Sequence, residues 1–320
     1  MREDTLFRIA SISKPIGAAL TLSLIEDGIL TLEDPIGTWL PEAASPRVLT
    51  RPDAPLDDTV DAVRPITIRH LLTMTAGWGA MLRPTPLQAE MMARGVFSGA
   101  LGQSLPADEF VARVCSLPLA FQPGEGWLYD TPMALLGILI MRATGRSLTE
   151  LLDERVFGPL DMTDTAFEGS ADRLATAYKP TQDGLAVLDP ADGRFARPPA
   201  FEELNGGLVS TAADVLRFFC AMVDGELLSP ESRALMIADA LTPELREQSH
   251  PIVDPGGSWG LGTGLYPGGA WGWEGGTGTT AHVVPSRDAV GVLLTQRMML
   301  DPQDAYPDFW EAVQSQPNSV

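Results

Sequence analysis

The sequence predicts an α+β fold, in which helices pack on an antiparallel sheet and a mostly helical region is inserted between the first helix and the sheet. Helical apolar spacing dominates from about residue 85 to 157, and strand-like, turn-rich sequence follows from about residue 175. We expect two lobes with a cleft where they meet. The sheet lobe is predicted to contain residues 1–40 and 175–320, and the helical lobe residues 41–174.

The first helix is predicted over residues 11–27, as an amphipathic helix. Ser11 or Ser13 is its expected N-cap. Pro15 fits the first turn, and Gly28 follows as a stop. Further helical patterns occupy residues 66–78, 86–97, 107–118, 131–145 and 147–157.

The second half combines one clear helix with the best strand candidates of the chain. Residues 210–225 predict a helix with Ser210 or Thr211 as its cap and Asp214 completing a capping box. The expected strands alternate or run apolar between Gly and Pro turns and lie in residues 257–266, 271–285 and 288–298. Residues 306–314 predict a closing helix.

The charge of the chain excludes one class of partner. Its 42 acidic side chains outnumber 22 Lys and Arg, which gives a formal charge of −20 at pH 7. Such a surface repels phosphate backbones, so we expect no nucleic acid partner. No apolar window reaches membrane-spanning length, and the N-terminus lacks the apolar run of a signal peptide. The cytoplasm is therefore the expected location, whereas the oligomeric state is not indicated.

Neither a metal nor a cofactor is indicated. His70, His250 and His282 lie far apart without metal-ligand spacing, and a structural role is expected for His70. Residues 260–264 are glycine-rich but too strand-like for a dinucleotide loop. Two cysteines in apolar helical patterns do not make a disulfide framework.

Ser11 and Lys14 stand three residues apart at the opening turn of the first helix, which places them on the same face. A serine becomes a nucleophile when a neighbouring base takes its proton, and a lysine can be that base if burial lowers its pKa. The alternative is that Ser11 merely caps the helix and Lys14 is a surface cation. However, the chain has only two lysines, Lys14 and Lys179, and arginine could not act as a base at this position.

The Ser-x-x-Lys pattern in FRIASISKP, residues 7–15, resembles the nucleophile motif of the β-lactamase-related serine hydrolases. This family includes class C β-lactamases, DD-peptidases and family VIII esterases. Further segments are similar to family stretches in the family's order, almost end to end: residues 66–78, 121–145, 157–167, 205–218 and 271–296. A lone Ser-x-x-Lys is weak evidence, but six ordered segments are specific. The resemblance implies a β-lactamase/transpeptidase-like fold.

The resemblance also implies roles for individual residues. Ser11 corresponds to the acylated nucleophile, and Lys14 to its general base or proton relay. Tyr129 corresponds to the second base, which holds a proton between nucleophile and leaving group; the alternative is a half-buried interface tyrosine. The backbone N–H groups of Ser11 and Gly276 are expected to form the oxyanion hole.

The sequence departs from the family pattern at two substrate-binding positions. Tyr129-Asp130-Thr131 replaces Tyr-x-Asn, so Thr131 lacks the amide of that motif. Asp130 is expected to face away from Lys14, because a carboxylate there favours the charged ammonium and weakens the base. In the third motif Trp273 replaces a cation, and Gly275 shares its strand face if the segment is a strand. Trp273 is therefore expected to give the site an apolar wall with one N–H hydrogen-bond donor. The alternative is that Trp273 simply packs in the core.

Relatives carry a helix and two strands before the nucleophile, whereas ten residues precede Ser11 here. We therefore expect that N-terminal strands, and with them a potential export signal, are missing from the sequence.

The resulting hypothesis is a cofactor-free serine hydrolase that cleaves small carboxylic esters through an acyl-enzyme at Ser11. A small-molecule ester or amide is the expected substrate. The alternatives are a β-lactamase, a D-amino-acid peptidase or an acyltransferase of the same family. A catalytically silent, N-terminally truncated relative is the remaining alternative.

Overall fold

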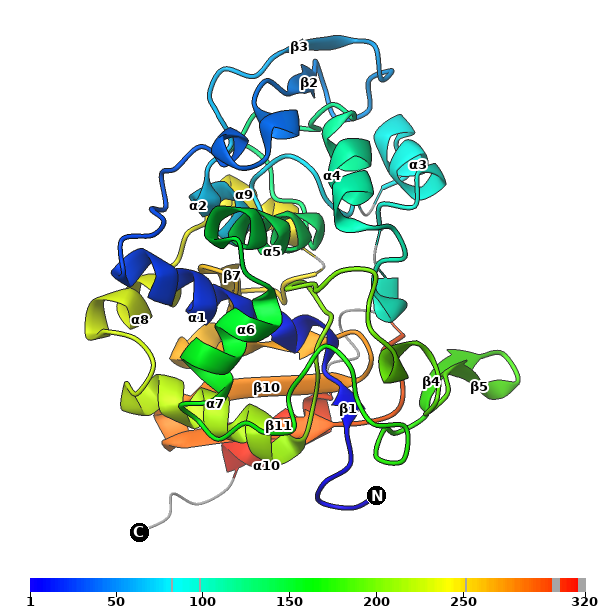
Figure 1. Cartoon of the computed structure of the whole chain (residues 1–320), viewed down its shortest axis with the longest axis vertical. Coiled ribbons are helices and arrows are strands. Elements are labelled where there is room, and N and C mark those ends of the chain that lie inside the picture. Colours follow the sequence, from blue (N-terminus) through cyan, green and yellow to red (C-terminus); the bar gives the residue numbers. More distant parts are fainter. Residues whose placement is uncertain (82, 98, 251, 301–305, 316–320) are drawn as a thin grey trace.

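A five-stranded antiparallel sheet, in the order β11-β10-β9-β8-β7, forms the lower part of the computed structural model (Figure 1). The structure describes all residues except 82, 98, 251, 301–305 and 316–320. The strands are β7 (Ser258–Trp259), β8 (Gly264–Leu265), β9 (Trp271–Gly275), β10 (Thr279–Val284) and β11 (Ala289–Leu294). All five lie in the segments predicted to form strands, which confirms the α+β fold class.

The two faces of this sheet carry different helices. Trp271 faces α7 (Ala212–Asp224), where its ring lies 5.7 Å from that of Phe219. His282 belongs to the opposite face, because the side chains of a strand alternate, and it stacks 4.1 Å from Trp310 of α10 (Pro307–Ser315). Apolar and aromatic contacts therefore cover both faces of the sheet.

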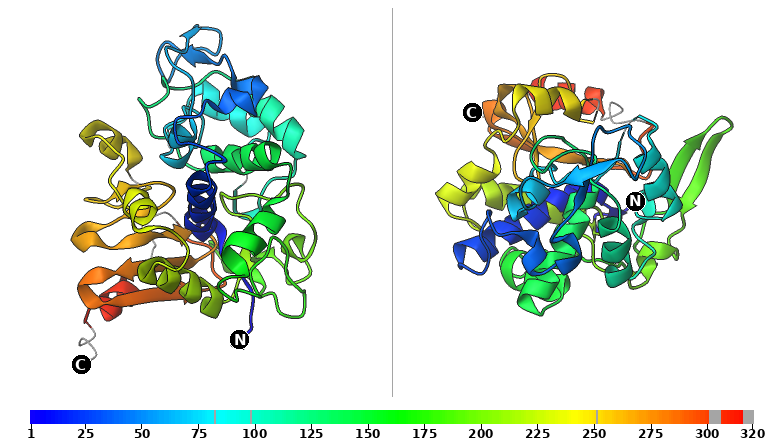
Figure 2. Two further views of the ribbon diagram at one scale, coloured as in Figure 1. Left: turned by 60° about the vertical axis from the view of Figure 1, so that its left-hand side comes forward. Right: turned by 90° about the horizontal axis from the view of Figure 1, so that it is seen from above.

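The first helix lies in the interior. It begins as the 3₁₀ turn η1 (Ala10–Ile12) and continues as α1 (Ser13–Glu26), which Figure 2 shows between the sheet and the helical part. The amphipathic prediction was incomplete, since α1 is buried on nearly all sides, as an all-round apolar helix must be. Neither Ser11 nor Ser13 caps it, because the N-cap position falls on Ile12 and no side chain caps the helix.

The predicted helices of the upper part all form: α2 (Ile68–Leu72), α3 (Pro86–Ala93), α4 (Ala107–Cys115), α5 (Thr131–Thr144) and α6 (Leu148–Leu152). Two short helices in the sheet half were not predicted: α8 (Pro230–Met236) and α9 (Pro243–Ser249). The remaining helical turns are Ile36–Thr38, Pro41–Ala43, Gly99–Leu101, Asp153–Phe157, Arg194–Ala196, Pro267–Gly269 and Pro285–Arg287.

Three two-stranded ribbons complete the fold. They pair β1 (Phe7–Arg8) with β6 (Val209–Ser210), β2 (Arg47–Leu49) with β3 (Thr59–Asp61), and β4 (Ala177–Thr181) with β5 (Gly184–Asp189). The β4–β5 hairpin projects from the body of the molecule (Figures 1 and 2). In the described part of the chain, no helix is both long and apolar enough to cross a membrane. The division into two lobes, the missing N-terminal strands and the cytoplasmic location stay predictions.

The predicted cap of α7 is half right. Thr211 Oγ1 accepts a hydrogen bond from the Asp214 backbone N–H at 3.2 Å, as an N-cap should. The Asp214 carboxylate does not complete a capping box. It accepts hydrogen bonds from the Asp164 backbone N–H and the Thr165 hydroxyl, and thereby ties α7 to the preceding chain.

Candidate active site

The segment that leads into Ser11 is held by the sheet from both sides. Arg8 pairs with Val209 in the β1–β6 ribbon. From the β9–β10 turn, Thr277 Oγ1 donates to the Arg8 carbonyl at 2.5 Å and Thr279 Oγ1 donates to the Ile9 carbonyl at 3.0 Å. These contacts hold the start of α1 against the end of β9. The glycine-rich third motif and Ser11 are therefore neighbours, as the resemblance implied.

Arg8 anchors the same segment through a buried ion pair. Its guanidinium donates to Asp189 Oδ2 at 2.8 and 2.5 Å, and to the carbonyls of Ala175 and Pro190. Both side chains of the pair are nearly inaccessible to solvent. A buried pair with this many hydrogen bonds gives the segment a defined position.

Lys14 is completely buried, and its ammonium makes three hydrogen bonds. Nζ donates to Ser11 Oγ at 2.8 Å, to Asp130 Oδ1 at 2.9 Å and to the Asn205 carbonyl at 2.5 Å. The predicted proximity of Ser11 and Lys14 is therefore present. The orientation predicted for Asp130 was wrong, because its carboxylate faces Lys14 directly.

Tyr129 is positioned by the segment that follows α2. The Ala80 backbone N–H donates to the Tyr129 carbonyl at 2.9 Å, and the Leu128 N–H donates to the Met74 carbonyl at 2.8 Å. Gly79 makes this approach possible, because a Cβ on it would lie 2.6 Å from the Leu128 carbonyl oxygen. The contacts place Tyr129 at the N-terminus of α5, beside Lys14.

The Tyr129 hydroxyl is a neighbour of Ser11, and the Lys14 ammonium lies 4.4 Å from the centre of the Tyr129 ring. The hydroxyl also accepts a hydrogen bond from the indole N–H of Trp273. Trp273 is 3% exposed and packs edge-on against Trp259 with ring centroids 4.6 Å apart. Trp273 is thus core packing and a donor at once, while its contact with a substrate stays a prediction.

The other predicted site residues differ in accessibility. Gly275 must be glycine, because a Cβ would lie 2.4 Å from the Ile9 carbonyl oxygen and 2.1 Å from Thr279 Oγ1. Gly276 is exposed and faces open space, as an oxyanion donor requires. Thr131 is 2% exposed, and among the described residues its hydroxyl has no hydrogen-bond partner.

Burial and charge act on the two predicted bases in different ways. Burial lowers the pKa of Lys14, but the Asp130 carboxylate and the Tyr129 phenol outweigh it, so this pKa lies above its ordinary value. The condition for Lys14 to act as the base, a pKa lowered by burial, is therefore not met. Burial raises the pKa of Tyr129, and the Lys14 charge offsets this only in part. Neither group gives up its proton easily at neutral pH.

Asn205 is a site residue that sequence reasoning missed. Its carbonyl accepts from Lys14, and its side-chain Nδ2 donates to Asp130 Oδ2 at 3.2 Å. The residue opens the family-like segment 205–218, which was the available signal. An asparagine thus occurs beside the lysine, although it comes from another part of the chain than the Asn of the Tyr-x-Asn motif.

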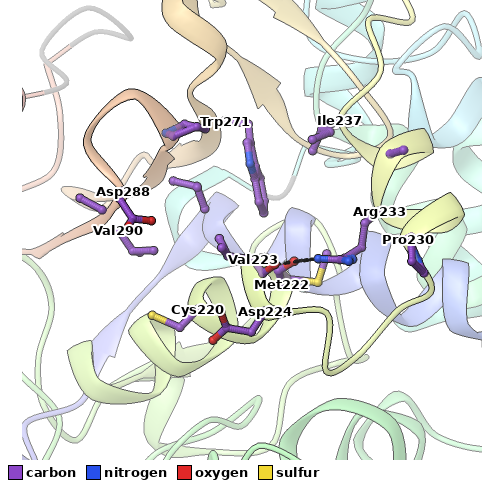
Figure 3. Close-up of a pocket in the computed structure, with 14 residues that line it drawn as sticks. Cys220, Met222, Val223, Asp224, Pro230, Arg233, Ile237, Trp271, Asp288 and Val290 are labelled. Atoms are coloured by element: carbon purple, nitrogen blue, oxygen red, sulfur yellow. Dashed lines mark hydrogen bonds between the residues drawn. The ribbon is translucent and has the colours of Figure 1, made fainter.

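A cavity of about 570 Å³ lies elsewhere, between α7, α8 and the β10–β11 turn. Figure 3 shows Met222, Val223 and Trp271 among its largely apolar lining, with Arg233 turned back to cap the end of α7. None of the predicted site residues lines it. Over the described residues, no cluster of three or more His, Cys, Asp or Glu side chains has an arrangement that could hold a metal ion.

Known proteins are similar to this chain in fold and in sequence. A family model described as "Beta-lactamase" matches residues 1–314. Protein Rv1367c of Mycobacterium tuberculosis is 37% identical over 327 residues, which cover 92% of this chain and 78% of that protein. Esterase EstB of Burkholderia gladioli is 35% identical over 281 residues, which cover 82% and 67%.

Among solved structures, the hydrolase EstCE1, titled as having promiscuous acyltransferase activity, superposes with a TM-score of 0.81. It is 24% identical, and the match covers 98% of this chain and 85% of that one. Fold, motif order and family match agree. The chain belongs to the β-lactamase family, as a β-lactamase-related serine hydrolase.

Proposed function

We propose that the protein hydrolyses small, uncharged carboxylic esters through a covalent acyl-enzyme at Ser11. One observation carries this proposal: Lys14 Nζ lies 2.8 Å from Ser11 Oγ, and the Tyr129 side chain lies beside both. Serine is a poor nucleophile without a neighbouring base, and here two candidate bases contact it. Esterase EstB, a 35% identical relative, gives independent support for an ester substrate.

The reaction follows from these positions. Ser11 Oγ attacks the ester carbonyl carbon while its proton moves to the Lys14–Tyr129 couple. The backbone N–H groups of Ser11 and Gly276 stabilise the oxyanion that forms. The carbon–oxygen bond to the leaving group then breaks, and the same proton passes to the departing alcohol. Water repeats the sequence on the acyl-enzyme, which releases the carboxylic acid and returns the proton to Ser11.

The charge of the site favours a neutral substrate. The Lys14 ammonium is paired with Asp130, and Trp273 provides no cation at the third motif. The next side chain, Glu274, is an acid that contacts His282 Nε2 at 2.6 Å. An anionic substrate therefore finds no free positive charge at these positions.

Acyl transfer to an alcohol is the second candidate function, because it uses the same acyl-enzyme. In that reaction, Thr131 and Gly275 would lie where the substrate and the accepting alcohol bind.

Hydrolysis of p-nitrophenyl butyrate by the purified chain tests the proposal. Ser11→Ala should abolish turnover and labelling by a fluorophosphonate probe, whereas Ser23→Ala, on the same helix, removes a hydroxyl that bonds only the Leu20 carbonyl and should change neither. Unchanged turnover in Ser11→Ala would refute the role of Ser11. Nitrocefin tests the β-lactamase alternative, and an added alcohol that yields a transesterified product tests acyl transfer. A wild-type chain that takes no label would indicate the catalytically silent alternative.

A further inference from the structure

The three acceptors around Lys14 match the donors of an ammonium group. Asp130 Oδ1 and the Asn205 carbonyl can only accept, and both contact Nζ together with Ser11 Oγ. An ammonium has three N–H donors and saturates all three contacts. A neutral amine would leave the Asp130 carboxylate without a counter-charge in a site where the lysine side chain has no solvent access.

Asp130 is held in place rather than free to turn away. Its second carboxylate oxygen accepts from Asn205 Nδ2 at 3.2 Å. Its backbone has φ +80° and ψ −68°, and the Thr131 N–H donates to the Tyr129 carbonyl across it at 3.2 Å. These values describe a strained γ-turn, which costs about 1–3 kcal/mol and persists only where the surroundings enforce it. The turn aims Tyr129 and Asp130 at Lys14 together.

The Tyr129 oxygen has the opposite surroundings. The Trp273 indole N–H can only donate, and it reaches this oxygen, whereas the Lys14 ammonium lies over the Tyr129 ring and adds a positive charge. The remaining contact is the Ser11 hydroxyl. With its own Oγ accepting from Lys14, Ser11 is free to direct its proton at Tyr129. One fixed donor and one neighbouring positive charge therefore prepare this oxygen to accept that proton.

We propose that Asp130 is a positioning residue of the reaction: as the direct counter-ion of the buried Lys14 it keeps the lysine an ammonium, and this makes the Tyr129 phenolate the group that accepts the Ser11 proton. The proposal deepens the proposed function and rests on it. In acylation the Ser11 O–H bond breaks as the Ser11 oxygen bonds to the carbonyl carbon, and the phenolate becomes a phenol. The phenol then gives this proton to the leaving alkoxide. Lys14 keeps its three protons throughout.

The titratable groups around the pair act on Lys14 and on Tyr129 in different ways. On Lys14 they are Asp130 and Tyr129, both of which raise its pKa against the effect of burial. On Tyr129, burial and Asp130 raise the pKa, and Lys14 lowers it. The Tyr266 phenol also interacts with Tyr129 through its charge, and its hydroxyl donates to Glu274. Removing the Asp130 charge makes the surroundings of Lys14 and Tyr129 more positive by one charge. The Lys14–Tyr129 pair should therefore lose its first proton at lower pH.

The test uses the scarcity of lysine in this chain. With side-chain ¹³C-labelled lysine, NMR gives two lysine signals, Lys14 and the exposed Lys179, which serves as an internal reference. In the wild-type protein the Lys14 signal should keep its ammonium shift across the pH range in which turnover rises. A Lys14 signal with the amine shift at a pH where the enzyme turns over would overturn the proposal.

Asp130→Asn keeps the shape and removes the charge. Lys14 should then titrate about 1–3 pH units lower than in the wild type, the range for an opposite charge at this distance. The rise of kcat/KM with pH should move in the same direction, whereas Asp130→Glu should keep the wild-type position even where its rate is lower. Unmoved titration and rate profiles in Asp130→Asn would overturn the counter-ion role. The NMR titration needs no turnover, so it tests the counter-ion role even if the protein does not hydrolyse the ester. If the variant does not fold, the wild-type titration still tests whether Lys14 stays an ammonium.

Discussion

Replacing Trp273 tests the hydrogen bond that its indole N–H donates to Tyr129, the proposed base. Trp273→Phe keeps an aromatic ring beside Trp259 and takes away the hydrogen bond to the Tyr129 oxygen. This bond lowers the pKa of Tyr129, so its loss should raise that pKa further. Hydrogen bonds to charged groups contribute about 1.5–3 kcal/mol, which corresponds to about 10- to 150-fold in kcat/KM for p-nitrophenyl butyrate at neutral pH.

The pH dependence of kcat/KM distinguishes a raised Tyr129 pKa from a general disruption of the site. The rise of kcat/KM should move to higher pH by about 1–2 units, since about 1.4 kcal/mol equals one pKa unit. The defect should therefore shrink as the pH increases.

Trp127→Phe is the matched control. Trp127 also stacks on Tyr129, with ring centroids 5.7 Å apart, but its Nε1 has no partner among the described residues. Its profile should stay at the wild-type position. A constant loss at every pH in Trp273→Phe, or an equal shift in Trp127→Phe, would refute the reasoning.

Three further outcomes follow from contacts around the site. Asp189→Asn leaves the buried Arg8 guanidinium without its counter-charge, so urea unfolding should show a loss of about 3 kcal/mol, and an unchanged midpoint would contradict this. Gly275→Ala pushes a methyl group into the Ile9 carbonyl and should lower kcat at least about tenfold, with a stability cost of about 1–3 kcal/mol. Arg142 and Arg173 lower the pKa of Glu42 and Asp164 respectively. These ion pairs stabilise the folded protein above about pH 4, and this stability is lost as the pH falls further and the carboxylates take up protons. In an acid titration the free energy of unfolding should fall by under about 1 kcal/mol for each partly exposed pair.

The parts of the site that the sequence could predict are those fixed by local spacing. Ser11 and Lys14 meet because residues three apart on a helix share a face. Tyr129 was found through the resemblance of the segment around it to a family motif. The two faces of β9 followed from strand alternation, since Trp273 points toward Tyr129 and Glu274 toward His282 on the other side.

Asp130 shows where local reasoning fails. Its orientation was inferred from what a carboxylate does to a lysine base, but its backbone is set by tertiary contacts on both sides. Ala80 holds the Tyr129 carbonyl, and Asn205, 75 residues further along the chain, binds the carboxylate itself. A positive φ at a non-glycine residue leaves no sequence pattern. The same limit hid Asn205, because only folding brings it to Lys14.

The missed helices have a different explanation. α8 and α9 both begin with a hydroxyl cap followed by proline, in Ser229-Pro230 and Thr242-Pro243, and both caps accept a backbone N–H. These start signals were present in the sequence. Each helix is only seven residues long, however, which is too short to show an apolar period against its turn-rich surroundings.

The charges of the site connect the proposed substrate preference with the proposed proton chemistry. Lys14 and Asp130 cancel, so the resting site has no free cation to hold a substrate carboxylate. In the proposed reaction, negative charge develops on the oxyanion, and the Tyr129 phenolate carries its charge until it takes the Ser11 proton. N–H donors meet the charge in both places. Asp130 and Trp273 then act on Tyr129 in opposite directions, because the carboxylate raises the pKa of the phenol and the indole lowers it. On this balance, we expect that the site gains nothing from an anionic substrate and that its activity depends on the pH at which Tyr129 loses its proton.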